Sequence, residues 1–271
     1  MSAAADITRL RDEQGRSPNS IDWERVLTIN YRGYVDPGGV VIDVGAHNGM
    51  HSRRFRRYLK PERLILVEPI PELAHGLRRE FHRDRRVEVV EVALSTEPRT
   101  TTFVVDDTAP GESGLRNRSL ALGTTHSTRE ITVQVERLDD WAIEGDLRFV
   151  KIDVEGGELD VLLGAGSTVD RHRPIISLEF GVTTAGMFGR SAEDLRSFAA
   201  SHDLTLLDLL GNDVSGDFAE VGSTYYWDFL LVPTERLPAL SARRADVRRR
   251  ALHSIENFNP TIERWKKRLR R

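Results

Sequence analysis

The stretch Val40-Val-Ile-Asp-Val-Gly-Ala-His-Asn-Gly49 decides the fold, because it has the pattern of a buried strand that breaks into a glycine turn and then a helix. Gly45 permits backbone conformations closed to other residues, and Gly49 lets the next helix pack closely. A second apolar run, Leu64–Val67, ends at Glu68, whose carboxylate can accept hydrogen bonds from both hydroxyls of a ribose. Together these features predict the first βαβ unit of a Rossmann-like domain.

The residue types in this turn favour S-adenosylmethionine over a dinucleotide. Dinucleotide folds need a middle glycine that lets the backbone approach a pyrophosphate, and here that position is His47. Asp43 would repel a diphosphate but suits a cationic ligand, and S-adenosylmethionine carries a ribose, an ammonium and a sulfonium without phosphate. The predicted cofactor residues are Asp43, Gly45, Ala46, His47, Asn48, Gly49, Glu68, Pro69, Ala93 and Asp153.

Length and composition bound the class of protein. A chain of 271 residues can bury a full core, and one domain with appendages is expected. Cysteine is absent, which excludes disulfides and a cysteine nucleophile. No apolar run approaches the roughly 20 residues of a membrane span, and residues 1–20 lack the apolar core of a signal peptide. We therefore expect a cytoplasmic protein.

The net charge of −3 hides a basic tail on an acidic body. Residues 243–271 hold eleven Lys or Arg and three carboxylates, a net +8, so that residues 1–242 carry −11. Apolar residues recur in this tail at helical spacing, which predicts an amphipathic helix, interrupted near Pro260, that covers acidic surface of the chain or of a second subunit. A homodimer is the partner we expect. The stripe consists of Leu252, Ile255, Phe258, Ile262, Trp265 and Leu269.

The remaining apolar runs alternate with helical patterns, which predicts an α/β fold with a mostly parallel, doubly wound sheet and a final antiparallel strand. We expect residues 1–35 to form a helical segment at the pocket, 36–235 the Rossmann-like domain with a lid or substrate insertion at 106–129, and 236–271 the helical tail. Strands are expected at 87–92, 149–152, 174–178, 204–210 and 225–232, β-rich segments at 100–105 and 131–135, and helices at 71–81, 158–163 and 192–201.

Carboxylates gather where the predicted strands end, at the edge where open α/β sheets bind ligands. They are Asp43, Glu68, Asp153, Glu155 and Glu179. Methyl transfer to a hydroxyl requires removal of its proton. Asp153 and Glu179 could hold Mg²⁺ to acidify the hydroxyl; otherwise Asp153, His172 or another nearby histidine would act as the base. Glu158, in a first helical turn, is expected to cap that helix.

Histidines add few firm candidates. His47 and His51 are four residues apart, but Asn48 stands where a zinc-protease motif has Glu, so we expect His47 to line the cofactor turn and His51 to pack. His126 lies in the 106–129 insertion and could contact the substrate, together with Glu155.

Three blocks of the sequence resemble the FkbM family of S-adenosylmethionine-dependent methyltransferases. They are the glycine turn within 41–49, Val67-Glu-Pro69, and the run Phe149-Val-Lys-Ile-Asp-Val-Glu-Gly156 through Glu158, within a resemblance over about residues 40–180. Where the family commonly has Ala in the last block, this chain has Gly157.

This resemblance implies a class I methyltransferase that O-methylates hydroxyls of sugars, polyketides or other natural products. It carries Asp43, Gly45 and Glu68 over as donor-binding residues, and it places Asp153, Glu155 and Glu179 near the acceptor.

Other functions stay open at this point. The basic tail motivates a methyltransferase that acts on RNA, although the acidic strand ends and the lack of an aromatic and basic cluster speak against nucleic acid. Methyl transfer to a carboxyl group and noncatalytic cofactor binding are the further alternatives.

Overall fold

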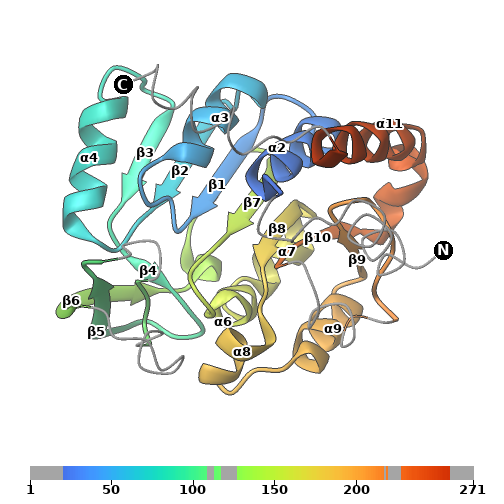
Figure 1. Cartoon of the computed structure of the whole chain (residues 1–271). Coiled ribbons are helices and arrows are strands. Elements are labelled where there is room, and N and C mark those ends of the chain that lie inside the picture. Colours follow the sequence, from blue (N-terminus) through green and yellow to red (C-terminus); the bar gives the residue numbers. More distant parts are fainter. Residues whose placement is uncertain (1–20, 109–112, 117–126, 217, 219–226, 257–271) are drawn as a thin grey trace.

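A computed structural model of the chain describes residues 21–108, 113–116, 127–216, 218 and 227–256 (Figure 1). Its main sheet has seven strands in the order β3-β2-β1-β7-β8-β10-β9. All neighbours pair in parallel except β10, which is antiparallel to both β8 and β9. The predicted Rossmann-like fold with an antiparallel strand is therefore confirmed. The strands are β1 Val40–Val44, β2 Arg63–Val67, β3 Val87–Val90, β7 Leu147–Ile152, β8 Ile175–Glu179, β9 Leu204–Asp208 and β10 Asp228–Pro233.

The helices alternate with these strands along the chain (Figure 1). α4 begins at Pro71, as expected for a residue that has no N–H to leave unpaired in the first turn. α9 begins with a capping box in which Ser191 and Asp194 bond each other's backbone N–H. The helices are α2 Trp23–Tyr34, α3 Met50–Tyr58, α4 Pro71–Phe81, α6 Glu158–Leu163, α7 Gly166–His172, α8 Val182–Met187, α9 Ala192–Ser201 and α11 Leu237–Glu256, with single 3₁₀ turns at Leu138–Asp140 and Thr234–Arg236.

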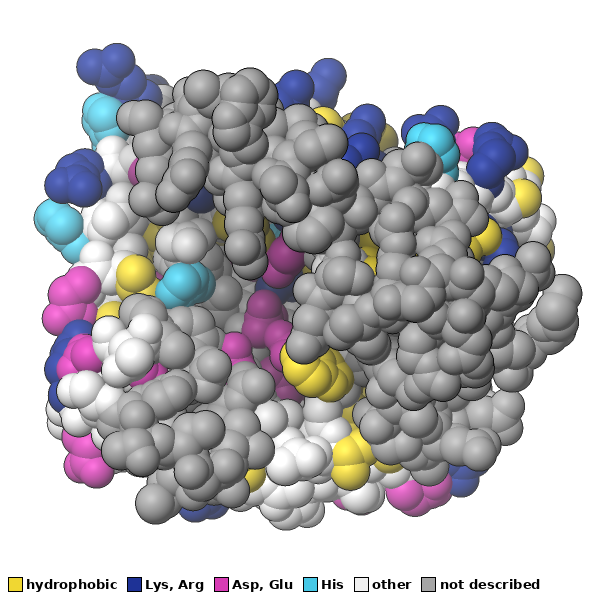
Figure 2. Space-filling view, in the orientation of Figure 1, with side chains coloured by type: hydrophobic (Ala, Val, Ile, Leu, Met, Phe, Trp, Pro, Cys, Tyr) yellow, Lys and Arg dark blue, Asp and Glu magenta, His cyan; other side chains and the backbone are white. Residues whose placement is uncertain are grey.

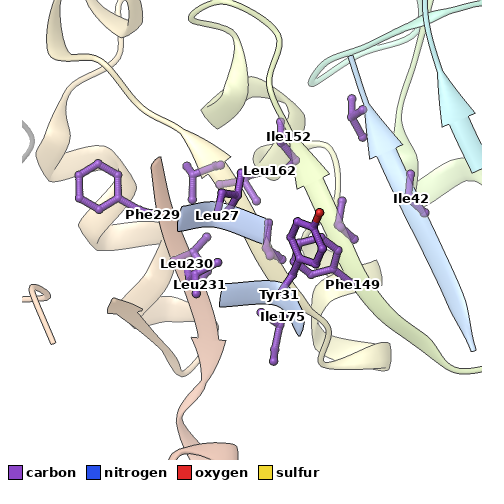
Figure 3. Packing of buried hydrophobic residues seen from close by; sticks show 14 of the residues in the cluster. Leu27, Tyr31, Ile42, Phe149, Ile152, Leu162, Ile175, Phe229, Leu230 and Leu231 are labelled. Atoms are coloured by element: carbon purple, nitrogen blue, oxygen red, sulfur yellow. The ribbon is translucent and has the colours of Figure 1, made fainter. Parts of the chain in front are cut away.

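Helix α2 is anchored in the main core. Leu27 and Tyr31 point from it toward the central strands, beside Phe149 of β7 (Figure 3). The Tyr31 ring lies 4.9 Å from the Phe55 ring and 5.8 Å from the Phe149 ring, centroid to centroid. Buried aromatic side chains of this size supply much of the hydrophobic stabilisation of a core. Helix α2 is thus held against the sheet through Leu27 and Tyr31.

A second, three-stranded sheet lies beside the main one, in the order β4-β6-β5. The expected strand at 87–92 ends at Val90, and β4 of the second sheet, which was not predicted, begins at Ala93. The β-rich segments at 100–105 and 131–135 form the long hairpin pair of this sheet. Its strands are β4 Ala93–Leu94, β5 Arg99–Asp106 and β6 Thr128–Glu136.

The described part of the basic tail packs against its own chain. Helix α11 lies along α2, and Val247, Ala251 and Ile255 are buried. The approach is close: a Cβ on Gly33 would lie 2.1 Å from Cγ2 of Val247. The other stripe residues from position 258 onward lie outside the described residues, and the homodimer stays a prediction. Within the described part of the chain, no helix has the length and apolar character needed to cross a membrane.

Candidate active site

A cavity of about 280 Å³ opens at the carboxyl ends of the central strands. Figure 2 shows Asp and Glu side chains gathered in the hollow of this face. Among the described residues that line the cavity, seven are Asp or Glu and only Lys151 is Lys or Arg. The lining residues are Glu24, Asp43, Val44, Gly45, Ala46, His47, Asn48, Met50, His51, Val67, Glu68, Pro69, Ile70, Val92, Ala93, Leu94, Phe103, Ser113, Leu115, Lys151, Asp153, Val154, Glu155, Gly157, Asp160, Glu179 and Phe188.

The glycine turn after β1 is locked to both neighbouring strands. Gly45 has φ +78°, and its N–H and that of Ala46 donate to the carbonyl of Val67 at 2.9 and 3.0 Å. On the other side, a Cβ on Gly45 would lie 1.8 Å from the carbonyl oxygen of Asp153. A side chain at this position would therefore collide with backbone, which explains the glycine.

Glu68 organises the same turn from the end of β2. Its Oε2 accepts the N–H of His47 at 2.7 Å, and its Oε1 accepts the N–H of Ile70 at 2.9 Å. The side chain is only 3% exposed, and burial raises the pKa of Glu68 to about 7. Each carboxylate oxygen has a second lone pair, so the group can hold the turn and still accept hydrogen bonds from a diol in the cavity.

The wall beside Glu68 is apolar. The small sheet and α4 share a separate hydrophobic cluster that includes Ile70, Ala93 and Phe103, with Leu115 packed against it. These four side chains also line the cavity. An aromatic base next to the Glu68 carboxylate would find both an apolar surface and, at its sugar, a hydrogen-bond acceptor.

Lys151 is a charged residue of the cavity that the sequence analysis did not single out. It lies on β7 directly opposite Asp43 of β1, is 4% exposed, and donates from Nζ to Oδ2 of Asp153 at 2.7 Å. Burial disfavours its charged form, but the charges of Asp153 and Asp43 outweigh burial and raise the pKa of Lys151. A buried ammonium thus remains charged at the floor of the cavity.

Asp43 differs from its expected role as an independent negative charge. Its Oδ2 accepts a hydrogen bond from the hydroxyl of Ser52 at 2.6 Å, and it is 1% exposed. Burial raises the pKa of Asp43, although Lys151 opposes the shift. The acidic character of the cavity therefore rests on its other carboxylates more than on Asp43.

Asp153, Glu155 and Glu179 form a carboxylate cluster in which one oxygen from each residue lies within 4.8 Å of the other two. Burial opposes the ionisation of Asp153, but Lys151 outweighs it and lowers the pKa of Asp153. Burial and the charge of Asp153 raise the pKa of Glu179 well above its usual range, and the two groups hydrogen-bond each other. The raised pKa of Glu179 favours its protonated form, which can donate a hydrogen bond to an ionised Asp153.

Glu158 supports the loop that carries this cluster. Its Oε1 accepts the N–H groups of Val154 and Gly156, each at 3.0 Å. Within that loop, Glu155 adopts φ +61°, and a Cβ on Gly156 would lie 2.8 Å from the carbonyl oxygen of Thr184. Glu158 therefore fixes the loop ahead of α6, whereas α6 has no side-chain cap in the described part of the chain, so the expectation that Glu158 caps this helix is wrong.

Glu24 and His51 close the cavity on the side of α2 and α3. Nε2 of His51 contacts Oε2 of Glu24, and Arg54 lies 3.5 Å from the same oxygen. Burial opposes ionisation of Glu24, but the hydrogen bond to His51 outweighs it and lowers the pKa of Glu24. His51 is buried, as expected, whereas Glu24 had given no signal in the motif analysis.

Comparison with known families agrees with this geometry. Residues 43–204, more than half of the chain, match the family model of the methyltransferase FkbM domain. The chain belongs to the FkbM methyltransferase family. The matched span includes the glycine turn, Glu68 and the carboxylate cluster, but Glu24 precedes it.

Two curated relatives of this FkbM protein cover about half of it. The 2-O-methyltransferase NoeI of Sinorhizobium fredii is 27% identical over 153 residues, which are 51% of this chain and 61% of NoeI. Methyltransferase 1 of Beauveria bassiana is 27% identical over 154 residues, with 50% and 61% covered. This chain thus spans about three fifths of the length of either relative.

A solved FkbM methyltransferase from Methylobacillus flagellatus KT is also similar. It has a TM-score of 0.46 and 16% sequence identity, over 75% of this chain and 50% of the other.

Not every residue predicted for the site reaches the cavity of this FkbM protein. Gly49 does not line it; a Cβ there would lie 2.7 Å from Cδ2 of Leu77, so this glycine serves the packing of α3 against α4. His172 ends α7, just before β8, at the opposite edge of the sheet, so the expectation that it acts as the base is wrong. His126 lies outside the described residues. The other predicted cofactor residues, with Glu155 and Glu179, line the cavity.

Proposed function

We propose that this protein is an S-adenosylmethionine-dependent O-methyltransferase that acts on a hydroxyl of a sugar, polyketide or other natural product. The observation that carries the proposal is the continuity of one cavity from the turn held by Gly45 and Glu68 to the cluster of Lys151, Asp153 and Glu179. A donor site and a group able to accept a proton thus face the same space.

The donor site has the features that S-adenosylmethionine requires. Glu68 would hold the ribose hydroxyls, with the apolar wall of Ile70, Ala93 and Phe103 beside the adenine. Of the lining residues that the structure describes, Lys151 is the one Lys or Arg, and it is paired with Asp153; Glu24 has a lowered pKa, so the lining suits a ligand with positive charge better than a phosphorylated one. A mononucleotide or dinucleotide cofactor therefore fits poorly.

When bound, S-adenosylmethionine supplies a methyl carbon on a sulfonium, and the carbon–sulfur electron pair returns to sulfur as the carbon–oxygen bond forms. The acceptor hydroxyl must lose its proton in this reaction. Asp153 is placed to take it, because Lys151 keeps Asp153 ionised and Glu179 already holds a proton of its own. Until Asp153 takes this proton, Lys151 balances its negative charge.

A divalent cation bound at the cluster is a second way to promote loss of the hydroxyl proton. Asp153, Glu155 and Glu179 offer oxygen ligands of the kind that Mg²⁺ takes. However, Asp153 already has a cationic partner in Lys151, and protonated Glu179 is a poor ligand, which supports the base route. Exhaustive dialysis against EDTA separates the two: full activity afterwards supports the base, and loss restored by Mg²⁺ supports the metal.

The hydroxyl as acceptor rests on the family and on the name of one relative, a 2-O-methyltransferase. The test begins with isothermal titration of the purified protein with S-adenosylmethionine and S-adenosylhomocysteine. A panel of sugar and polyketide alcohols is then incubated with protein and donor, and mass spectrometry detects methylated product. Failure to bind either ligand would overturn the proposal.

A further inference from the structure

One wall of the cavity comes from helix α2, which precedes the residues matched by the family model. Residues three, four and seven positions apart share a helix face, so Glu24 lies on the same face as Leu27 and Tyr31. Those two side chains are buried against the central strands (Figure 3). The helix period therefore turns Glu24 toward the sheet edge, where it lines the cavity.

The Glu24 carboxylate is held in place from one side. His51, itself 6% exposed and packed between the rings of Tyr31 and Phe55, contacts its Oε2. Arg54 donates to the main-chain carbonyl of Glu24 at 3.1 Å and lies 3.5 Å from the same Oε2. Oε1 has no hydrogen-bond partner within the part of the chain that the structure describes, and the side chain is 47% exposed. One fixed, uncommitted anionic oxygen thus borders the cavity.

The other carboxylates of the cavity, among the described residues, are either engaged or belong to the acceptor side. Glu155 and Glu179 lie in the cluster around Asp153. Within the described ranges, Asp43 leaves Oδ1 without a partner, but it is 1% exposed and lies opposite Lys151. Glu24 contacts His51 and Arg54 through Oε2, and its side chain is 47% exposed, so it is the carboxylate best placed to receive a cation from a ligand. The engaged groups and their partners are Asp43 with Ser52, Glu68 with the N–H groups of His47 and Ile70, Asp153 with Lys151, and Asp160 with Arg190.

We infer that Glu24 binds the α-ammonium group at the amino-acid end of the methyl donor. The inference rests on the proposed function and follows from the order of groups around the cavity. Glu68 and the apolar wall take the adenosine, and the Glu155 cluster with Phe188 faces the acceptor. The remaining wall, formed by α2 and α3, faces the amino-acid end. Helix α2, which precedes the matched residues, thus contributes Glu24 to the donor site.

The test compares two ligands on two proteins by isothermal titration. S-adenosylhomocysteine has the amino-acid end, whereas 5′-methylthioadenosine lacks it. Glu24→Gln should weaken binding of S-adenosylhomocysteine roughly 10- to 100-fold, the value of a charged hydrogen bond, and leave 5′-methylthioadenosine unchanged. Glu144→Gln, an exposed substitution remote from the cavity, should change neither affinity. Thermal melting of each variant reports whether it is folded.

Equal loss of affinity for both ligands would mean that Glu24 only supports the fold, and unchanged binding of S-adenosylhomocysteine would also overturn the inference. If the wild-type protein binds neither ligand, the proposed function itself fails. If Glu24→Gln does not fold, the wild-type protein still tests the inference. Deaminated S-adenosylhomocysteine should bind to it roughly 10- to 100-fold more weakly than the parent ligand, and equal affinity would contradict the inference.

Discussion

The α-carbon of Gly45 lies so close to the carbonyl oxygen of Asp153 that a Cβ on this glycine would come within 1.8 Å of it. This contact joins the turn that would hold the donor to the residue that would accept the proton. Because Asp153 directly follows β7 and Gly45 directly follows β1, two adjacent parallel strands set the distance. The proposed donor and base would thus be positioned by one sheet edge.

Gly45→Ala should therefore abolish binding of S-adenosylhomocysteine. The new methyl group would meet backbone that cannot rotate away, and φ +78° is strained for alanine, which by itself costs about 1–3 kcal/mol. Titration calorimetry and chemical denaturation measure the two effects. The control is Gly76→Ala in α4, where a Cβ would meet nothing within 4 Å; it should stabilise the protein by about 0.5–1 kcal/mol. Normal binding by Gly45→Ala would contradict the close contact.

Asp153→Asn should lower turnover by about 10²–10⁴-fold, the usual contribution of a general base, with little change in donor affinity. Steady-state kinetics and titration with S-adenosylhomocysteine separate the two quantities. His172→Ala, at the other edge of the sheet, is the control and should leave turnover unchanged. Comparable losses of turnover and of donor affinity in Asp153→Asn would show that its role is wrongly assigned.

Replacement of Glu179 distinguishes a protonated partner from an anionic one. Because its pKa is raised well above the usual range, Glu179 donates to Asp153, and Gln can donate in the same way. We expect Glu179→Gln to retain most of the turnover and Glu179→Ala to lose much more. A Glu179→Gln protein as inactive as Glu179→Ala would instead favour an ionised Glu179, as a metal ligand would be.

Glu68→Gln should weaken donor binding by about 1.5–3 kcal/mol, roughly 10- to 100-fold in Kd. Each Glu68 oxygen accepts a backbone N–H, so the amide of Gln would place a donor against one of them and loosen the turn at His47 or Ile70. Isothermal titration with S-adenosylhomocysteine measures the loss. Glu91→Gln, which affects only an exposed pair with Arg78, should bind normally.

Glu158 should make the protein less stable as pH rises. Burial raises its pKa to about 7 from an ordinary 4.5, so the folded state binds a proton that the unfolded state has released between these values. Its contribution is fully present below pH 4.5 and is lost as pH rises through about 7. Glu158→Gln keeps both backbone hydrogen bonds, because one oxygen accepts them, yet it does not titrate.

The free energy of unfolding should therefore fall less steeply between pH 5 and 8 in Glu158→Gln than in the wild type, and the variant should be more stable at pH 8 by about 1–3 kcal/mol. Urea denaturation across this range measures the slope. Parallel curves for the two proteins would mean that Glu158 is ionised at little cost. Glu144→Gln again serves as the exposed control.

Local patterns in the sequence suffice for the sheet and for much of the site. Apolar runs followed by glycine or carboxylate place Gly45, Glu68, Asp153 and Glu179 at strand ends, and parallel strands in this topology bring those ends to one edge. The sequence also places His172 before the predicted strand at 174–178, at the end away from the carboxylates. The order of the residues alone was therefore enough to exclude His172 from the site.

The tertiary structure alone decided the charges and the partners. In the sequence, Lys151 is one residue of a predicted buried strand. The strand register places it opposite Asp43, and its Nζ lies 2.7 Å from Oδ2 of Asp153. Glu24 enters the cavity only because α2 packs through Tyr31 onto the sheet. The physical reason is range: strand and turn formation depend on neighbours in sequence, whereas burial and ion pairing depend on groups that folding brings together from distant parts of the chain.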